Sequence, residues 1–181
     1  MNNHYQYATF AGGCFWCLQG PFEAQDGVIE VWAGYTGGTT ENPTYQQVSQ
    51  GNTGHREAVQ VLFDPGKISY TKLLEIFWLQ IDPTDPNGQF ADRGSQYKTA
   101  IFYHNEEQKR LALESKEMLQ NSAVFDKKVV TEIIPATKFY KAEPDHQFYY
   151  RKNPLHYQLY KKASGREQFI NSTLGKQRKR K

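Results

Sequence analysis

The chain has 181 residues, of which 38% are hydrophobic, 14% aromatic and 23% charged, a composition typical of one soluble globular domain. It has no run of about 18 apolar residues and no signal-peptide pattern at its start, so we expect no membrane contact and a cytoplasmic location. Five basic residues among the last seven make the net charge +3; without them the count is 17 basic against 19 acidic. We expect this tail to be solvated and disordered, and we do not expect a nucleic-acid partner.

Strand-like and helix-like segments alternate along the chain without a strict rhythm. We expect strands over residues 5–11, 28–35, 56–63, 97–104 and 127–134. We expect helices over 14–24, 45–50, 70–80 and 106–120, with caps at Thr44, Ser69 and Asn105 and a bend or an interruption at Gly20–Pro21. Residues 81–96 form a long predicted loop, of a length that is often functional. This order predicts an α+β fold with a mixed β-sheet flanked by helices and a long irregular C-terminal segment.

Both cysteines of the chain lie in the sequence GGCFWC, as Cys14 and Cys17. A cysteine at a helix start lies near unpaired N–H groups that favour its thiolate, and residues three apart share a helix face within reach of a disulfide. A redox dithiol is one interpretation; the others are a zinc site, a thioredoxin-like oxidoreductase and two buried, inert thiols. No two of the five histidines have zinc-finger spacing, and the bulk of Phe15 and Trp16 opposes docking onto another protein's disulfide.

Further motifs follow in a fixed order: GYTGG, NPTYQQVSQGNTGHREAVQV, FDPGKISY, QIDPTDPNGQFADRGSQYKTAIFYHNEEQ and FYKAEPDHQFYY. Together with GGCFWC they resemble the methionine sulfoxide reductase A family, in the subgroup whose motif is Gly-Cys-Phe-Trp-Cys. The resemblance covers about residues 8 to 160. It implies one catalytic domain over residues 1–165, which leaves 166–181 as a C-terminal extension with the basic tail.

The resemblance implies reduction of methionine S-sulfoxide, free or within oxidised proteins, with thioredoxin as reductant and neither a cofactor nor a metal. It implies a ferredoxin-like α/β plait, and nothing in the sequence demands more than a monomer. It places the catalytic cysteine at Cys14 and the acidic proton donor at Glu57. The other implied positions are a pocket for the substrate methyl at Phe15 and Trp16, donors to the sulfoxide oxygen at Tyr45 and Tyr97, and an acidic loop residue at Asp92.

These residue types suit the chemistry of sulfoxide reduction. A thiolate is the best side-chain nucleophile, and the departing oxygen needs a proton. A carboxyl supplies one near neutral pH only when burial raises its pKa, and Glu57 lies in a predicted strand where alternate positions face inward. Tyr45 and Tyr97 can donate hydrogen bonds to the oxygen without competing as nucleophiles. His55 and His146 also lie in the motifs, and we expect structural hydrogen bonds from them.

The chain lacks the C-terminal cysteine with which many relatives resolve the sulfenic acid, and Ser49 stands where many have cysteine. Cys17 is therefore the only thiol that can resolve a Cys14 sulfenic acid. We expect Cys17→Ser to complete one fast turnover and then stall with thioredoxin. Two other functions stay open. The first is a general dithiol–disulfide oxidoreductase, which insulin-type disulfide reduction would support. The second is a non-enzymatic module that binds methionine-rich or oxidised segments, which binding without product would support.

Overall fold

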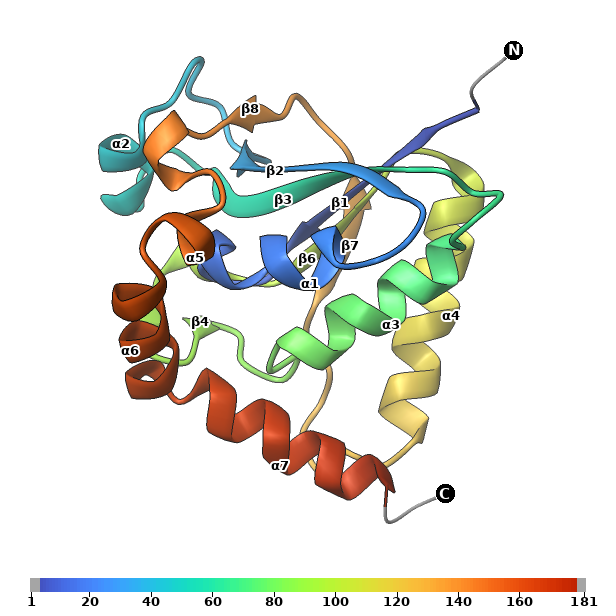
Figure 1. The fold of residues 1–181 in the computed structure, drawn as a ribbon. Coiled ribbons are helices and arrows are strands. Elements are labelled where there is room, and N and C mark those ends of the chain that lie inside the picture. The colour runs from blue at the N-terminus through green and yellow to red at the C-terminus, as the bar shows by residue number, and fades with distance from the viewer. Residues whose placement is uncertain (1–3, 179–181) are drawn as a thin grey trace.

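The computed structural model describes residues 4–178. Within this range the centre is a six-stranded sheet with the order β7-β6-β1-β3-β2-β8 (Figure 1). Strands β6 and β7 are parallel and the other neighbours are antiparallel. The strands are β1 (Gln6–Ala11), β2 (Val28–Thr36), β3 (Arg56–Phe63), β6 (Ala100–Tyr103), β7 (Glu132–Pro135) and β8 (Tyr140–Lys141), and a separate hairpin pairs β4 (Gly88–Gln89) with β5 (Asp92–Arg93).

Helices surround this sheet and confirm the predicted α+β class. Three of them lie on the same side of the sheet: α1 (Gln19–Glu23), α3 (Tyr70–Gln80) and α4 (Glu106–Asn121) (Figure 1). The others are α2 (Tyr45–Ser49), α5 (Tyr149–Lys152), α6 (Pro154–Ser164) and α7 (Arg166–Arg178), with short 3-10 turns η1 (Phe15–Cys17), η2 (Ser95–Tyr97) and η3 (Pro144–His146). The predicted caps are confirmed, because the side chains of Thr44, Ser69 and Asn105 each accept the backbone N–H three residues on.

The first predicted helix has a different break from the one expected. The segment 14–24 divides after Cys17, between η1 and α1, rather than at Gly20–Pro21. Pro21 lies in the first turn of α1, where a backbone N–H has no acceptor within the helix, so proline costs little there. The predicted break at Gly20–Pro21 is therefore wrong, although the predicted interruption exists.

Two predicted strands start later than expected. The strand over 97–104 begins at Ala100, because Tyr97 ends η2. The strand over 127–134 begins at Glu132, because the N–H of Val129 bonds the Gln120 side chain and the next N–H bonds a carbonyl of the 81–96 segment. Those donors are satisfied outside the sheet, so the ladder with β6 covers only four residue pairs.

The C-terminal segment is more regular than predicted. Helices α6 and α7 occupy most of residues 154–178, and α7 crosses beneath α3 (Figure 1). The predicted loop 81–96 likewise contains the β4–β5 hairpin and most of η2. The disorder expected for the basic tail is wrong for residues 175–178, which continue α7, and residues 179–181 lie outside the described residues.

The main core lies between the sheet and the helices α1, α3 and α4. Alternate residues of the three central strands face it: Ala8, Phe10, Val31, Ala33, Tyr35, Val59, Val61 and Phe63. Phe10 stacks between Phe22 of α1 and Phe77 of α3, with ring centroids 5.1 and 5.0 Å away. Glu57 has the parity of the core residues of β3, so the strand directs a carboxyl onto the same face as the core.

The opposite face of the sheet carries a smaller apolar cluster of Ala11, Ala58, Ala100 and Phe102. Phe139, in the connection from β7 to β8, packs against it. A methyl group at Gly34 would lie 2.4 Å from the Phe139 ring and 2.3 Å from the carbonyl oxygen of Tyr140. Glycine at this position therefore allows β8 and the connection before it to close over β2.

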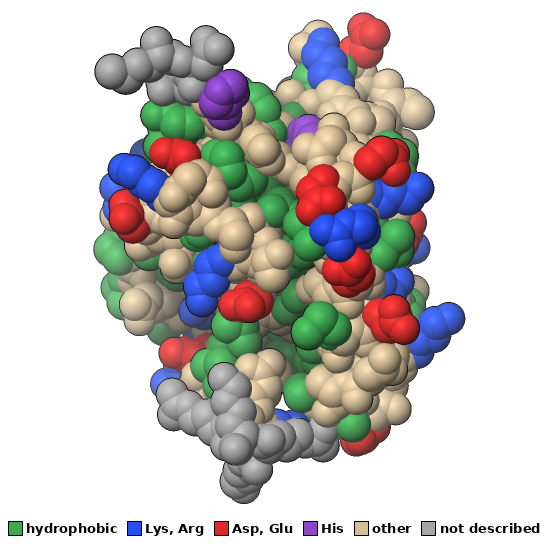
Figure 2. All heavy atoms as spheres, turned by 90° about the vertical axis from the view of Figure 1, so that its right-hand side faces the viewer, with side chains coloured by type: hydrophobic (Ala, Val, Ile, Leu, Met, Phe, Trp, Pro, Cys, Tyr) green, Lys and Arg blue, Asp and Glu red, His purple; other side chains and the backbone are tan. Residues whose placement is uncertain are grey.

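The outer surface mixes charges of both signs. On the face that Figure 2 shows, acidic and basic side chains are interspersed rather than gathered by sign. On α4, for example, Arg110 pairs with Glu107 and Glu114. No helix among residues 4–178 is long and apolar enough to cross a membrane.

Candidate active site

The turn after β1 brings the cysteine motif against the core. Gly13 has φ +82°, and a methyl group on it would lie 2.6 Å from the Cβ of Gln89. A methyl group on Gly12 would lie 2.8 Å from the side chain of Ile81. The two glycines therefore let the backbone turn while it packs tightly against the 81–96 segment, and the chain continues into Cys14 and η1.

Cys14 and Cys17 are both free thiols, with exposures of only 6% and 2%. Burial raises the pKa of Cys14 well above its ordinary value, and its hydrogen bond with Cys17 acts in the same direction. The same hydrogen bond lowers the pKa of Cys17 to about 6, assisted by Arg166 and by the O–H of Tyr157. Of the two thiols, Cys17 is therefore the one whose thiolate its surroundings favour.

This charge distribution corrects the expectation that a helix start favours a Cys14 thiolate. The structure η1 is a single 3-10 turn of three residues. Its first N–H, from Phe15, donates to Glu57, and the N–H of Cys17 donates to the carbonyl of Cys14. These donors are already used by oxygen acceptors, so the Cys14 sulfur gains little from them in the resting state.

Glu57 is a buried carboxyl beside the cysteine motif. It begins the core-facing row of β3, lies opposite Tyr35 of β2 and is 2% exposed, which confirms the predicted inward orientation. Its Oε1 accepts the N–H of Phe15 at 3.2 Å, and it also accepts a hydrogen bond from Tyr97. Burial raises the pKa of Glu57 to about 8, so the carboxyl is mostly protonated at neutral pH.

Tyr45 and Tyr97 approach Glu57 from two different elements. Tyr45 is the first residue of α2, which the Thr44 cap fixes, and Tyr97 ends η2. Burial raises the pKa of both phenols, and the nearby Glu57 acts in the same direction. Both therefore keep their protons near neutral pH, so both can donate O–H groups.

Phe15 and Trp16 have different surroundings. Phe15 is fully buried among aromatic rings, 5.8 Å from Tyr35 and 6.3 Å from Tyr45 between centroids. Trp16 is half-buried; its Nε1 donates to Nδ1 of His146 at 3.1 Å, and its ring stacks on Tyr149 at 3.9 Å. Phe15 thus forms a fixed wall, whereas Trp16 is held in place by groups from the C-terminal segment.

Asp92 enters the site from the β4–β5 hairpin. Its carboxylate accepts a hydrogen bond from the hydroxyl of Tyr160, which lies on α6. Burial raises the pKa of Asp92, and its charge acts on Cys14, Glu57 and both site tyrosines. The structure thus brings all eight predicted site residues together: Cys14, Phe15, Trp16, Cys17, Tyr45, Glu57, Asp92 and Tyr97.

The C-terminal residues at the site are those that the sequence did not assign. Glu143 accepts the Tyr35 hydroxyl at 2.9 Å and the backbone N–H of Tyr45 at 3.0 Å. Tyr149, Tyr157 and Tyr160 contact the cysteine motif or Asp92 from α5 and α6. Glu143 and Tyr149 lie in the motif FYKAEPDHQFYY, which could have marked them as site residues. Tyr157 and Tyr160 follow the motif, so nothing in the sequence beyond their residue type marks them as site residues.

The two motif histidines have the structural roles expected of them. His146 accepts the Trp16 indole N–H, and its ring stacks on Tyr45 at 4.1 Å. His55 accepts the N–H of Gly38 at 3.0 Å. Neither contact places an imidazole on a cysteine sulfur. Within the described residues no group of three or more histidine, cysteine, aspartate or glutamate side chains could hold a metal ion.

Known proteins similar to this chain are named as peptide methionine sulfoxide reductases. The family model described as peptide methionine sulfoxide reductase matches residues 6–178. The MsrA of Bacillus subtilis is 57% identical over 175 residues, which are 97% of this chain and 99% of that protein. The MsrA of Halalkalibacterium halodurans is 52% identical over 97% of this chain and 100% of its own length.

Solved structures agree with this result. Reduced Mxr1 from Saccharomyces cerevisiae superposes with a TM-score of 0.78 at 31% identity, over 83% of this chain and 87% of that one. Methionine sulfoxide reductase A of Corynebacterium diphtheriae gives a TM-score of 0.79 at 32% identity, over 86% and 77%. The sequence match extends over nearly the whole chain and the fold is shared, so the chain belongs to the peptide methionine sulfoxide reductase family.

Proposed function

We propose that this chain reduces the S epimer of methionine sulfoxide, free or within oxidised proteins, through Cys14, Glu57 and Cys17. The observation that carries the proposal is the placement of a protonated carboxyl beside a cysteine pair. Glu57 bonds the N–H of Phe15, the residue next to Cys14, and burial raises its pKa to about 8. A sulfoxide needs both a sulfur nucleophile and a proton for its oxygen, and this site offers the two together.

In the first step Cys14 Sγ attacks the sulfoxide sulfur while the Glu57 carboxyl gives its proton to the oxygen. Tyr45 and Tyr97 donate hydrogen bonds to the same oxygen, where negative charge develops. Phe15 and Trp16 hold the substrate methyl, and Asp92 supports the polar side of the pocket. Cys14 releases its thiol proton as it attacks, the substrate S–O bond breaks, and the oxygen passes with the Glu57 proton to Cys14. The substrate sulfur thereby gains two electrons and leaves as methionine, and Cys14 becomes a sulfenic acid.

In the second step Cys17 condenses with the sulfenic acid, which gives a Cys14–Cys17 disulfide and water. Thioredoxin then reduces the disulfide, and neither a cofactor nor a metal takes part. The close approach of the two thiols, which share a hydrogen bond, supports this step. The charge that Cys17 carries also supports it, because a thiolate is the attacking form.

Product analysis tests the proposal. The wild type and Cys14→Ser are each given methionine S-sulfoxide and R-sulfoxide with thioredoxin, thioredoxin reductase and NADPH. We expect methionine only from the S epimer and only with Cys14, and a racemic mixture should stop at about half conversion, the fraction open to an epimer-specific enzyme. Efficient reduction of insulin disulfides without sulfoxide reduction would favour a general dithiol oxidoreductase instead.

The proposal also covers the fold topology, the domain bounds, the oligomeric state and the cellular location. The order β6-β1-β3-β2 with α1 and α3 on one face supports a ferredoxin-like plait around the central four strands. We further propose a catalytic domain over residues 1–165, a monomeric state and a cytoplasmic location. The bacterial relatives and the interspersed surface charges are compatible with these assignments.

A further inference from the structure

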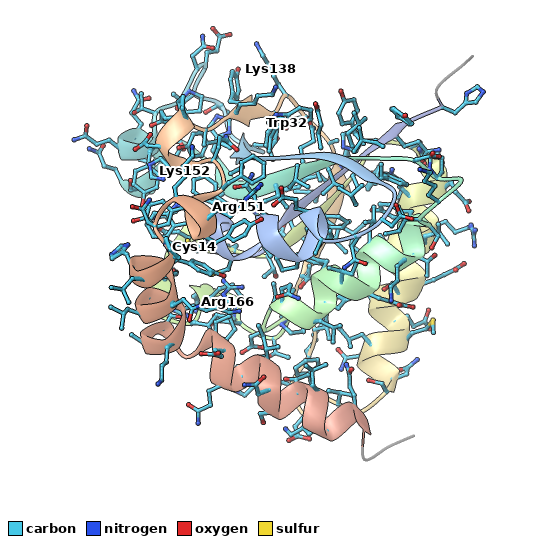
Figure 3. All side chains as sticks on the ribbon, viewed as in Figure 1. Cys14, Trp32, Lys138, Arg151, Lys152 and Arg166 are labelled. Atoms are coloured by element: carbon cyan, nitrogen blue, oxygen red, sulfur yellow. The ribbon has the colours of Figure 1, made fainter. Side chains whose placement is uncertain are left out.

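Arg166, the first residue of α7, is a fully buried cation close to the cysteine motif. Its side chain is only 1% exposed, and Figure 3 places it below Cys14, where α6 meets α7. A methyl group on Gly13 would lie 2.8 Å from Nη2 of Arg166, so the guanidinium packs directly against the turn that leads into Cys14. Burying an arginine is unfavourable unless a counter-charge compensates it.

The direct partners of Arg166 are neutral. Nη1 donates to the carbonyl of Gln80 at 2.7 Å and Nη2 donates to the carbonyl of Gly12 at 3.0 Å. The Phe90 ring lies 4.7 Å from the guanidinium carbon, and the buried Nε has no hydrogen-bond partner in the described part of the chain. No ion pair joins Arg166 to a carboxylate of residues 4–178. Two carbonyls orient this cation but do not neutralise it.

Two groups near Arg166 can carry the missing negative charge. Asp92 feels the positive charge of Arg166, but its carboxylate already accepts the hydroxyl of Tyr160 and it lies outside ion-pair distance. Cys17 feels the same charge, is buried to 2% exposure and receives the hydroxyl of Tyr157. The Arg166 cation and the Tyr157 hydroxyl therefore both favour negative charge on Cys17.

We propose that Arg166 is a positioning residue of the second half-reaction, in which its buried guanidinium serves as the counter-cation of the Cys17 thiolate. The inference rests on the proposed function. The Cys17 sulfur attacks the sulfur of the Cys14 sulfenic acid, so the S–S bond forms and the S–O bond breaks. The oxygen leaves as hydroxide and takes a proton from solvent to become water. Cys17 supplies the electron pair, and Arg166 keeps that pair available near neutral pH.

The titration of Cys17 also depends on other groups around it, which come from four parts of the fold. These are Cys14 in the turn after β1, Glu57 on β3, Tyr157, Tyr160 and Lys161 on α6, and Arg166 on α7. Burial opposes the thiolate, and the hydrogen bond from Cys14 favours it. Arg166 is the one cation among them that is fully buried, so solvent screens its charge least.

The test isolates Cys17 in a Cys14→Ser background, where it is the only thiol of the full-length chain. The thiolate is titrated by its ultraviolet absorbance and by the rate of iodoacetamide alkylation. We expect Arg166→Gln to raise the midpoint by about one pH unit or more, since an opposite charge nearby shifts a pKa by this amount. Lys162→Gln, which removes an exposed charge from the neighbouring helix, should leave the midpoint unchanged.

Arg166→Lys separates a charge effect from a structural clamp. Lysine keeps the positive charge but loses the two-pronged guanidinium that bonds the carbonyls of Gln80 and Gly12. We therefore expect Arg166→Lys to bring the Cys17 titration midpoint most of the way back to that of its parent. A midpoint that is the same in folded Arg166→Gln and in its parent overturns the inference, as does an Arg166→Lys midpoint equal to that of Arg166→Gln. Neither measurement involves a sulfoxide, so a failure of the proposed function is seen separately, as no methionine from the wild type.

With both cysteines present, Arg166→Gln should slow disulfide closure after one turnover by about fivefold at pH 6 and about twofold at pH 7, the fall in thiolate fraction when the pKa of Cys17 rises by one unit from about 6. The defect should shrink as the pH rises and Cys17 ionises without assistance. The measurement counts free thiols by rapid quench after one equivalent of methionine S-sulfoxide. A defect that is equal at all pH values would indicate a structural role for Arg166 and would contradict the inference.

Discussion

The indole ring of Trp16 lies face to face with the phenol ring of Tyr149, with centroids 3.9 Å apart and planes within 9° of each other. The two residues are far apart in the sequence, and the contact holds the wall of the proposed methyl pocket against α5. His146 fixes the same indole through its N–H. The proposed methyl pocket therefore combines the N-terminal motif with the C-terminal segment.

This contact predicts that Tyr149→Ala lowers kcat/KM for methionine sulfoxide by about three- to tenfold, chiefly through KM. An aromatic pair contributes roughly 0.5–1.5 kcal/mol beyond its buried area, and Trp16 loses this restraint. Tyr149→Phe keeps the stacking ring and should behave like the wild type. Steady-state kinetics decide the matter, and a Tyr149→Ala enzyme with unchanged KM would contradict the prediction.

Glu57 should control the rate of the first step. Glu57→Gln keeps the shape and removes the acid, so we expect methionine release in a single turnover to fall by about 10²- to 10⁴-fold. In the wild type the rate should decline as the pH rises through about 8, where the carboxyl loses its proton. Glu30→Gln, an exposed change in β2, is the matched control. Full single-turnover activity of Glu57→Gln would remove Glu57 from the mechanism.

Glu57 should also make stability depend on pH. Its folded pKa of about 8 lies above its ordinary value of 4.5, so between these limits the native state binds a proton that the unfolded state does not. The free energy of unfolding must therefore fall as the pH rises, by about 1.4 kcal/mol per pH unit from this residue. Glutamine does not titrate, so Glu57→Gln lacks this dependence on pH. The free energy of unfolding of Glu57→Gln minus that of the wild type should therefore increase from pH 5 to pH 8. Urea unfolding at several pH values measures the difference.

Cys17→Ser should form one equivalent of methionine per enzyme and then stop with thioredoxin as reductant. The hydroxyl of serine cannot form a disulfide, and the described residues hold no third thiol. Dimedone labelling should then detect a persistent sulfenic acid on Cys14. Sustained turnover of this variant with thioredoxin would show that a Cys14–Cys17 disulfide is not required.

Two glycines should respond to substitution in opposite directions. Gly34→Ala places a methyl group 2.3 Å from the Tyr140 carbonyl, so it should destabilise the fold by roughly 1–3 kcal/mol. Gly175 lies inside α7 with no atom within 4 Å of such a methyl group, and Gly175→Ala should be neutral or stabilise by about 0.5–1 kcal/mol. Thermal unfolding of the two variants tests both directions, and a stable Gly34→Ala protein would contradict the packing described for β8.

Local signals in the sequence were enough to predict several elements closely. The caps at Thr44 and Ser69 depend on neighbours three residues away, and the helix over 70–80 has its predicted bounds. The alternation over 56–63 predicted the strand, and the family resemblance of the motif around Glu57 predicted its inward side. The strand expected from residue 127 was wrong because distant acceptors, in α4 and the 81–96 segment, take its first donors.

The sequence by itself determined the family and the candidate residues, and it left Cys17 as the one other thiol, because motifs, residue types and the count of two cysteines are properties of the chain. Only the tertiary structure decided the protonation of the site. Burial raises the pKa of Glu57, and the groups around the cysteine pair raise the pKa of Cys14 and lower that of Cys17. Arg166 is 149 positions beyond Cys17 in the chain, and no local pattern relates the two. Ionisation depends on distance and solvent exclusion, and both are set by packing.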